Sequence, residues 1–124
     1  MGDMSPNFNR SEFACKCGCG LDGIDPMFVW SLQHSRERVG IPYTIHSGCR
    51  CPAHNKAEGG AETSAHVPRN DYPRVKCSDI GCNNMFDRKK ILADVCTRFR
   101  HIGIHAKFIH VDDDPAKPDG VFTY

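Results

Sequence analysis

Three residues far apart in the sequence carry side chains that metal ions bind: His66, Asp79 and His110. Zinc accepts imidazole nitrogen and carboxylate oxygen, and a catalytic zinc keeps three protein ligands so that water fills the fourth position. Two histidines and one aspartate fit that set. The chain has 7 histidines, so scattered surface histidines and an aspartate in a turn or helix cap explain these residues better when they are considered alone.

Cysteines form a second group of potential metal ligands. Cys15, Cys17 and Cys19, three of the 8 cysteines, are spaced by two residues, closer than in the Cys-x-x-Cys pairs of most structural zinc sites. With Cys51, Cys77 or a histidine they would complete a tetrahedral site. Disulfides, which suit a protein that works outside the cytoplasm, and reduced, partly buried thiols are the alternatives, and the sequence leaves all three open.

The length and the charge of the chain limit its number of domains and the classes of function that it can have. We expect 124 residues to form one domain with a single modest core. A net charge of +1 lacks the basic excess of a dedicated nucleic-acid binder. The chain has no apolar run long enough to span a membrane, and its first twenty residues are too polar for a secretory signal. We therefore expect a soluble protein made in the cytoplasm.

Two helices are predicted from caps and apolar spacing. Asp25 as N-cap and Pro26 as the first helical residue begin a helix over residues 26–39, which Gly40 ends. Asn84 caps a second helix that ends before Gly103. The side chains predicted for its buried face are Phe86, Ile91, Leu92, Val95, Cys96 and Phe99.

Strands are predicted over residues 43–46, 75–80, 104–112 and 121–124, which makes the fold class α+β. Successive side chains of a strand point to opposite faces, so His110 and Asp112 should lie on the same face of the third strand, together with Ile104, Ala106 and Phe108. The polar segments 49–70 and 113–120 are predicted to be loops, where functional sites usually lie.

Several short motifs occur in an order that resembles one protein family. Ser47-Gly48-Cys49-Arg50 and Asn55 are followed by Gly59-Gly60-Ala61, by Ser64-Ala65-His66 and by Ser78-Asp79-Ile80. This series resembles the zinc D-Ala-D-Ala carboxypeptidase family of peptidoglycan peptidases. Segment 7–13 with the cysteines after it, and the segment Phe108-Ile109-His110-Val111-Asp112, resemble the small single-domain branch of that family.

The resemblance implies a fold, a cofactor and a set of roles. The fold would be the one shared with lysostaphin-type endopeptidases and the hedgehog signalling domain, a small antiparallel sheet flanked by helices, in a single zinc peptidase domain over residues 1–124. His66, Asp79 and His110 match the zinc ligands, Arg50 matches the arginine that faces the scissile carbonyl, and Ser64 matches a serine near the substrate. Zinc activates water and polarises the carbonyl, and a fixed guanidinium stabilises the developing oxyanion.

The sequence departs from the family pattern in two places. His66 and Asp79 lie 13 positions apart, which implies an insertion within residues 68–74 and makes Asp71 a rival ligand. The positions two and three residues before His110, where the family often has a general base, hold Phe108 and Lys107. Asp112 is the best substitute, either as the general base or as a carboxylate that orients His110, and His105 comes next.

We therefore expect a zinc-dependent metallopeptidase that hydrolyses peptide bonds of peptidoglycan. It would be an endolysin-like D-Ala-D-Ala carboxypeptidase or endopeptidase of phage or bacterial origin. It would act as a monomer on the stem peptide in the cell wall. The alternative is a catalytically silent zinc-binding or phage structural module with the same fold. A zinc-ribbon nucleic-acid binder built on the cysteines would explain neither the Ser-Gly-Cys-Arg segment nor the near-neutral charge.

Overall fold

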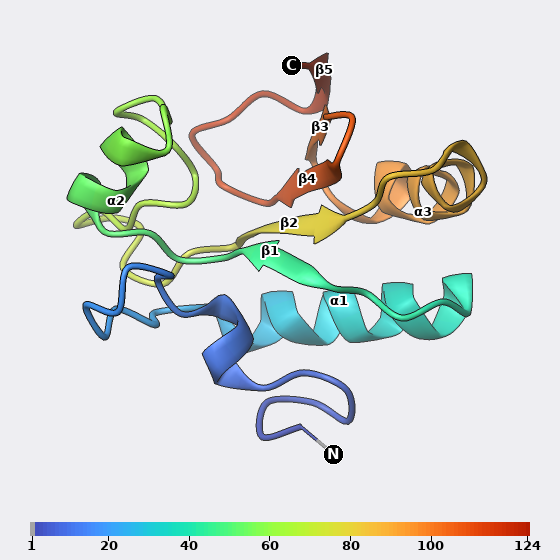
Figure 1. Cartoon of the computed structure of the whole chain (residues 1–124), viewed down its shortest axis with the longest axis horizontal. Helices are drawn as coiled ribbons and strands as arrows, with labels where there is room; N and C mark the ends of the chain where they lie inside the picture. The colour runs from blue at the N-terminus through green and yellow to red at the C-terminus, as the bar shows by residue number, and fades with distance from the viewer. Residues whose placement is uncertain (1) are drawn as a thin grey trace.

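The computed structural model describes residues 2–124 and contains a five-stranded sheet (Figure 1). Its strands pair in the order β1-β2-β4-β3-β5. Pairing is antiparallel except between β3 and β5, which are parallel. The α+β class is confirmed, but the sheet is mixed and not purely antiparallel. The strands are β1 (Ile45–Ser47), β2 (Cys77–Gly81), β3 (His101–Ile104), β4 (Phe108–Asp112) and β5 (Gly120–Thr123).

The first predicted helix is observed with the predicted bounds, α1 (Pro26–Val39). The Asp25 carboxylate accepts hydrogen bonds from the backbone N–H groups of Met27 and Phe28, two donors that a helix start would otherwise leave unpaired. Gly40 ends the helix in the left-handed conformation, with φ of 81°, which glycine adopts without steric cost.

The second predicted helix is α3 (Met85–Arg98), and the Asn84 side chain caps it by accepting from the N–H of Asp87. Ile91, Val95 and Phe99 face the core as predicted, whereas Phe86 and Cys96 are exposed. The burial prediction for these two residues is wrong because the buried stripe follows the four-residue spacing of 91, 95 and 99. Cys96, one residue on from Val95, is turned about 100° away from it.

The predicted strand over residues 104–112 is in fact a hairpin of β3 and β4. Residues 105–107 form its turn, which is closed by the N–H of His105 donating to Phe108 O and by the N–H of Lys107 donating to the His105 ring. Ile104 and Ala106 therefore do not share a strand with His110. Two short helices were also not predicted, the 3-10 helix η1 (Arg10–Phe13) and α2 (Pro52–Ala57), the latter inside a predicted loop.

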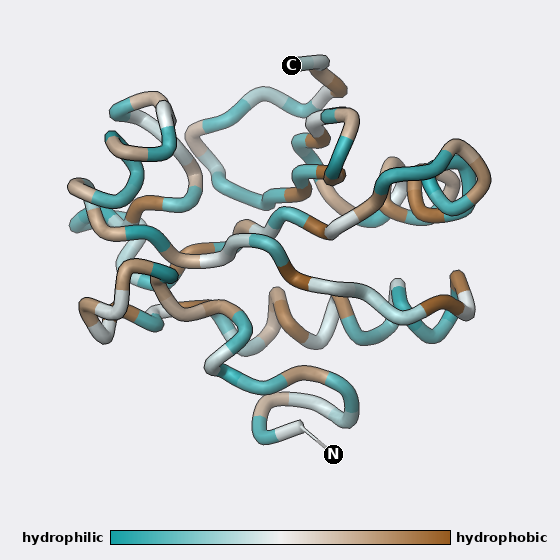
Figure 2. Tube along the Cα trace, in the orientation of Figure 1, coloured by the Kyte–Doolittle hydropathy of each residue, from teal (hydrophilic) through white to brown (hydrophobic). Residues whose placement is uncertain are grey.

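The two faces of the sheet have different chemistry. One face carries buried apolar side chains that pack with those of α1 and α3, which contact each other; the set includes Phe28, Leu32, Ile80, Ile91, Val95, Ile102, Ile109 and Val111. The other face carries the polar side chains of Asp79 from β2 and of His110 and Asp112 from β4. Figure 2 shows hydrophobic positions recurring along α1 and the strands, and a largely hydrophilic loop between β4 and β5. Within residues 2–124 no helix has the length and apolar character needed to cross a membrane.

Gly48, just after β1, is where η1 packs against the rest of the chain. The N–H of Cys49 donates to Phe13 O at 2.8 Å, and a Cβ at Gly48 would lie 2.8 Å from both Cα and O of Phe13. We expect Gly48→Ala to lower the free energy of unfolding by about 1–3 kcal/mol, because the backbone of η1 must move. Urea unfolding measures this. Gly120→Ala is the control, since a Cβ there meets no atom within 4 Å; equal losses in both variants would contradict the packing argument.

Candidate metal and catalytic site

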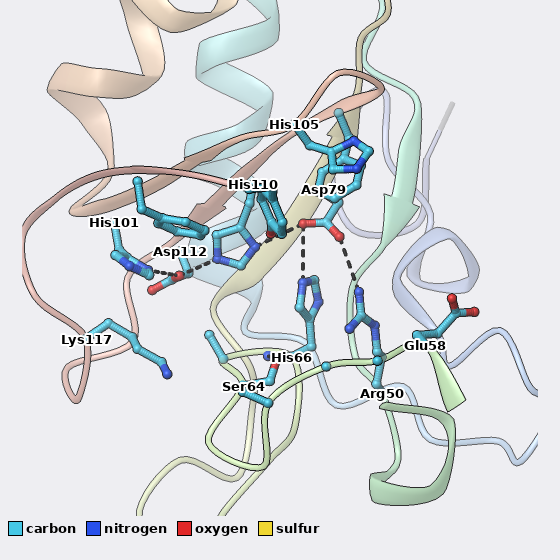
Figure 3. A pocket seen from close by; sticks show the side chains of 17 residues that line it. Arg50, Glu58, Ser64, His66, Asp79, His101, His105, His110, Asp112 and Lys117 are labelled. Carbon is cyan, nitrogen blue, oxygen red and sulfur yellow. Dashed lines mark hydrogen bonds and ion pairs between the residues drawn. The ribbon is translucent and has the colours of Figure 1, made fainter. Parts of the chain in front are cut away.

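His66, Asp79 and His110 meet on the polar face of the sheet (Figure 3). Asp79 of β2 lies opposite His110 of β4 in the strand register. Its Oδ1 is 3.0 Å from His110 Nδ1 and 3.3 Å from His66 Nε2. All three side chains are buried. The sequence-predicted donor set is therefore assembled around one carboxylate oxygen, although its members come from a loop and two strands.

A backbone carbonyl fixes the ring of His66. His66 Nδ1 lies 2.6 Å from Gly48 O, and since a carbonyl can only accept, Nδ1 carries the proton. Nε2 is then the lone-pair nitrogen of the neutral ring, and it points to Asp79. The N–H of Arg50 donates to His66 O at 2.8 Å, which ties the histidine's backbone to the segment after β1. Such partners hold a histidine in the tautomer that a metal requires.

Asp112 is fully buried between two histidines. Its Oδ2 lies 2.5 Å from His110 Nε2 and 2.7 Å from His101 Nδ1, and its Oδ1 accepts from the N–H of Asp114 at 3.1 Å. His101 is a site residue that the sequence prediction missed. It lies directly opposite Asp112 in the pairing of β3 with β4, so a correctly predicted hairpin would have revealed it.

Arg50 is held at the edge of the same site. Its Nη2 lies 3.3 Å from Asp79 Oδ2, its Nε donates to Ser47 Oγ at 2.9 Å, and its Nη1 donates to Asn55 Oδ1 at 3.2 Å. Gly60 makes room for that amide, since a Cβ there would lie 2.2 Å from Asn55 Oδ1. Three fixed bonds leave the guanidinium little freedom, so it presents a positive charge at a defined place.

The three central groups shift one another's ionisation. Burial disfavours the charged form of Asp79, but the charge of His66 and the hydrogen bond from His110 outweigh burial and hold the pKa of Asp79 below its usual range. Burial also disfavours protonated His66, yet the charges of Cys77 and Asp79 raise its pKa to about 9. Cys77, Asp112 and Asp79 raise the pKa of His110 in the same way. In the metal-free protein the site therefore attracts positive charge.

Two of the three separations among the proposed donor atoms, those that involve Asp79 Oδ1, suit a tetrahedral zinc. Zinc bonds of 2.0–2.1 Å to nitrogen and oxygen place neighbouring ligand atoms about 3.3 Å apart, and the separations here are 3.0 and 3.3 Å. Cys77, which the sequence prediction did not assign to this site, brings a buried thiol 3.9 and 4.0 Å from the two ring nitrogens of His110. Within residues 2–124, two groups of donors at this site have ligand atoms that all lie within 4.8 Å of one another: His66 with Cys77 and His110, and His101 with His110 and Asp112. Asp79 belongs to neither group.

A pocket opens over these residues. Ser64 lies on its wall, as do Glu58 and Lys117 from the flanking loops. Phe122 and Tyr124 line the side formed by the end of the chain. The ring of Phe122 packs over Gly103, where a Cβ would lie 2.4 Å from it. His105 also lines the pocket and stacks on Phe108 with ring centres 4.3 Å apart.

The segment between His66 and Asp79 is anchored to the loop after β4. Arg69 donates two hydrogen bonds, of 2.9 and 2.8 Å, to the buried carboxylate of Asp114. Tyr72 OH donates to Ala65 O and accepts from the N–H of Lys76, which closes the base of the segment. Asp71 is 85 % exposed and lies 3.5 Å from Arg69 Nε, so the structure places Asp79, and not Asp71, beside the two histidines.

The sequence matches one described protein family. The family model described as Peptidase M15 matches residues 6–112. The matched range contains η1 and the cysteines after it, and it contains Arg50, His66, Asp79 and His110. A comparison with curated proteins gave no match.

The Arg69–Asp114 pair should stabilise the fold in a pH-dependent way. Burial raises the pKa of Asp114, but the hydrogen bonds from Arg69 and from the N–H of Ala116 outweigh it, and the net shift is downward. The stabilisation is then complete above the unfolded pKa of about 3.9 and is lost as the pH falls below it. We expect Asp114→Asn to lower the free energy of unfolding at pH 7 by about 1.5–3 kcal/mol.

Chemical unfolding at a series of pH values measures this effect. The difference between wild type and Asp114→Asn should shrink below pH of about 4, because the wild-type carboxylate is then protonated as well. Asp71→Asn is the matched control, and an exposed pair should contribute less than about 1 kcal/mol. A difference that stays constant into the acid range would contradict the argument.

Proposed function

Since this chain belongs to the peptidase M15 family, we propose that it is a zinc-dependent peptidase that hydrolyses peptide bonds of peptidoglycan. The observation that carries the proposal is the convergence of His66 and His110 on Asp79 beside the fixed guanidinium of Arg50, at the wall of an open pocket. Two imidazoles and one carboxylate make the ligand set of a catalytic zinc, which leaves one coordination position to water or substrate.

His66, Asp79 and His110 would hold the zinc ion. When bound, zinc supplies a Lewis acid that polarises a carbonyl and makes water a nucleophile near neutral pH. Arg50 would bind the oxygen of the scissile carbonyl, because its guanidinium is already held in place and the charge on that oxygen grows during hydrolysis. Ser64 on the pocket wall would contact the substrate backbone.

Asp112 would orient two histidines and would not itself be the base. Both of its oxygens are engaged and it is inaccessible to solvent. By accepting the Nδ1 proton of His101, it leaves His101 Nε2 as the lone-pair nitrogen of a pocket-lining ring. An imidazole oriented by a carboxylate is a common general base. We therefore assign the proton transfer to His101.

His105 is less suited to be the base than His101. Its Nδ1 accepts from the N–H of Lys107 at 3.0 Å, so in the neutral ring the proton lies on Nε2. That nitrogen can donate a hydrogen bond to substrate but has no lone pair to take a proton. His105 would therefore contribute to substrate binding at the pocket wall.

Peptidoglycan as substrate is supported by the motif resemblance and by the charges of the pocket. The side chains of Arg50 and Lys117 line it, and their positive charges suit the carboxylates of a stem peptide. The same chemistry serves a D-Ala-D-Ala carboxypeptidase and an endopeptidase. By this proposal the chain acts on the cell wall, in an endolysin-like role for phage or in wall turnover for a bacterium.

Cys77 supports a second candidate function, a silent zinc-binding module. Its thiol is fully buried beside His110 and belongs to a group of donors with His66 and His110. A fourth protein ligand would close the coordination sphere, and closed sites are structural. In that case the zinc would stabilise the fold and no hydrolysis would follow.

Zinc content and hydrolysis, measured on the same preparations, test the two functions. We expect His110→Ala to lose about one zinc per chain relative to wild type and to release no peptide ends from peptidoglycan, because one of three ligands is gone. Cys77→Ser is the matched variant and should keep both zinc and hydrolysis. Loss of zinc in Cys77→Ser, with a wild type inactive on several peptidoglycan types, would establish the silent module instead.

Two further variants separate the base from the carboxylate that orients it. His101→Gln should keep its zinc and lower kcat by about 10²–10⁴-fold. Asp112→Asn should weaken zinc binding about 10–100-fold, because His110 loses its partner. His105→Ala is the control and should change KM more than kcat. A kcat loss in His105→Ala as large as that of His101→Gln would reject the assignment.

A further inference from the structure

A second group of potential metal ligands lies outside the proposed catalytic site. Cys15, Cys17 and Cys19 follow η1, and Cys51 is the N-cap of α2, 32 positions beyond Cys19 in the sequence. Their four sulfur atoms all lie within 4.8 Å of one another. Cys15 is buried, Cys51 is half-buried, and Cys17 and Cys19 are exposed. The proposed function uses none of the four.

The sulfur separations match a tetrahedral metal centre. Cys15 Sγ lies 3.4 Å from Cys17 Sγ and 3.8 Å from Cys51 Sγ, and the sulfurs of Cys17 and Cys51 are 3.7 Å apart. Four sulfurs at 2.3 Å from a central zinc are about 3.8 Å from one another. Disulfides would join these cysteines in pairs and do not require all four to approach a common centre.

The backbone around the cluster is arranged to receive thiolates. The N–H of Cys51 points to Cys15 Sγ and the N–H of His54 points to Cys51 Sγ, each at 3.4 Å. Such donors stabilise negative sulfur. Burial disfavours the thiolate of Cys15, but the backbone N–H groups of Cys51 and Cys17 outweigh burial and lower the pKa of Cys15 to about 6.

Two glycines let thiols only two residues apart turn toward one centre. Gly18 and Gly20 have φ of 82° and 88°, values that other residues rarely adopt. The turn is closed by the N–H of Gly18 donating to Cys15 O and by the N–H of Cys15 donating to Leu21 O. The alternation of cysteine with glycine in this segment therefore has a geometric reason.

We propose that Cys15, Cys17, Cys19 and Cys51 bind a zinc ion in a closed four-sulfur site. Each thiol gives up its proton to solvent when the metal binds, and the four thiolates leave no position for water, so the site is structural. It fastens the segment after η1 to Cys51, the neighbour of Arg50. This site does not depend on the proposed peptidase function.

Zinc content of protein purified under reducing conditions tests the proposal. We expect about two zinc ions per chain in the wild type and about one in His110→Ala, where only the four-sulfur site remains. The double variant Cys17→Ser/Cys51→Ser should also hold about one and should unfold at a lower temperature. Cys96→Ser, which removes an exposed cysteine of α3, is the matched control and should hold as much zinc as the wild type.

Cobalt binding to His110→Ala gives a readout that needs neither activity nor a cysteine variant. A four-sulfur site should show intense sulfur-to-cobalt charge-transfer absorption, which a nitrogen and oxygen site lacks. All eight cysteines should react with an alkylating reagent after denaturation without reductant. His110→Ala without zinc and without that absorption, or disulfides found among these four cysteines, would overturn the proposal. A wild type that hydrolyses no peptidoglycan, together with a His110→Ala variant that keeps its zinc and shows that absorption, would reject only the peptidase function.

Discussion

The antiparallel register of β2 against β4 is the constraint on which the site depends. It sets Asp79 opposite His110 and Cys77 opposite Asp112, and the hairpin then sets His101 opposite Asp112. A slip of one residue would turn every one of these side chains to the other face of the sheet. That slip is prevented because the alternate residues, including Ile80, Ile109 and Val111, are fully buried against the helices. The apolar core therefore determines where the polar site forms.

The same alignment concentrates opposite charges in a buried place. Two carboxylates, Asp79 and Asp112, lie among three histidines with little solvent to screen them. Buried charges of this kind cost free energy unless each has partners. Here every carboxylate oxygen has at least one, because Arg50 and the N–H of Asp114 complete the set. These partners hold both carboxylates in fixed positions, so the site is preorganised to bind a cation.

The sequence predicts local features well and pairing between distant segments less well. The bounds of α1 and the cap of α3 follow from Asp25, Pro26, Gly40 and Asn84, whose effects act within one helical turn. The sequence predicts a single strand in place of the β3–β4 hairpin because the turn, His105-Ala106-Lys107, contains neither glycine nor proline. His101 was missed for the same reason, and the parallel pairing of β5 with β3 leaves no local signal at all.

The convergence of His66 with Asp79 and His110 was expected from motif order, and not from periodicity. Their spacing along the chain is uninformative because the segment between His66 and Asp79 is long. The segment is held in place despite its length. Tyr72 hydrogen-bonds Ala65 and Lys76 at the base of the segment, and Arg69 binds Asp114. Asp114 in turn follows Asp112 by two residues and donates its N–H to it. The segment between His66 and Asp79 is thus tied to the carboxylate that orients His110, and its length does not keep His66 from lying beside Asp79.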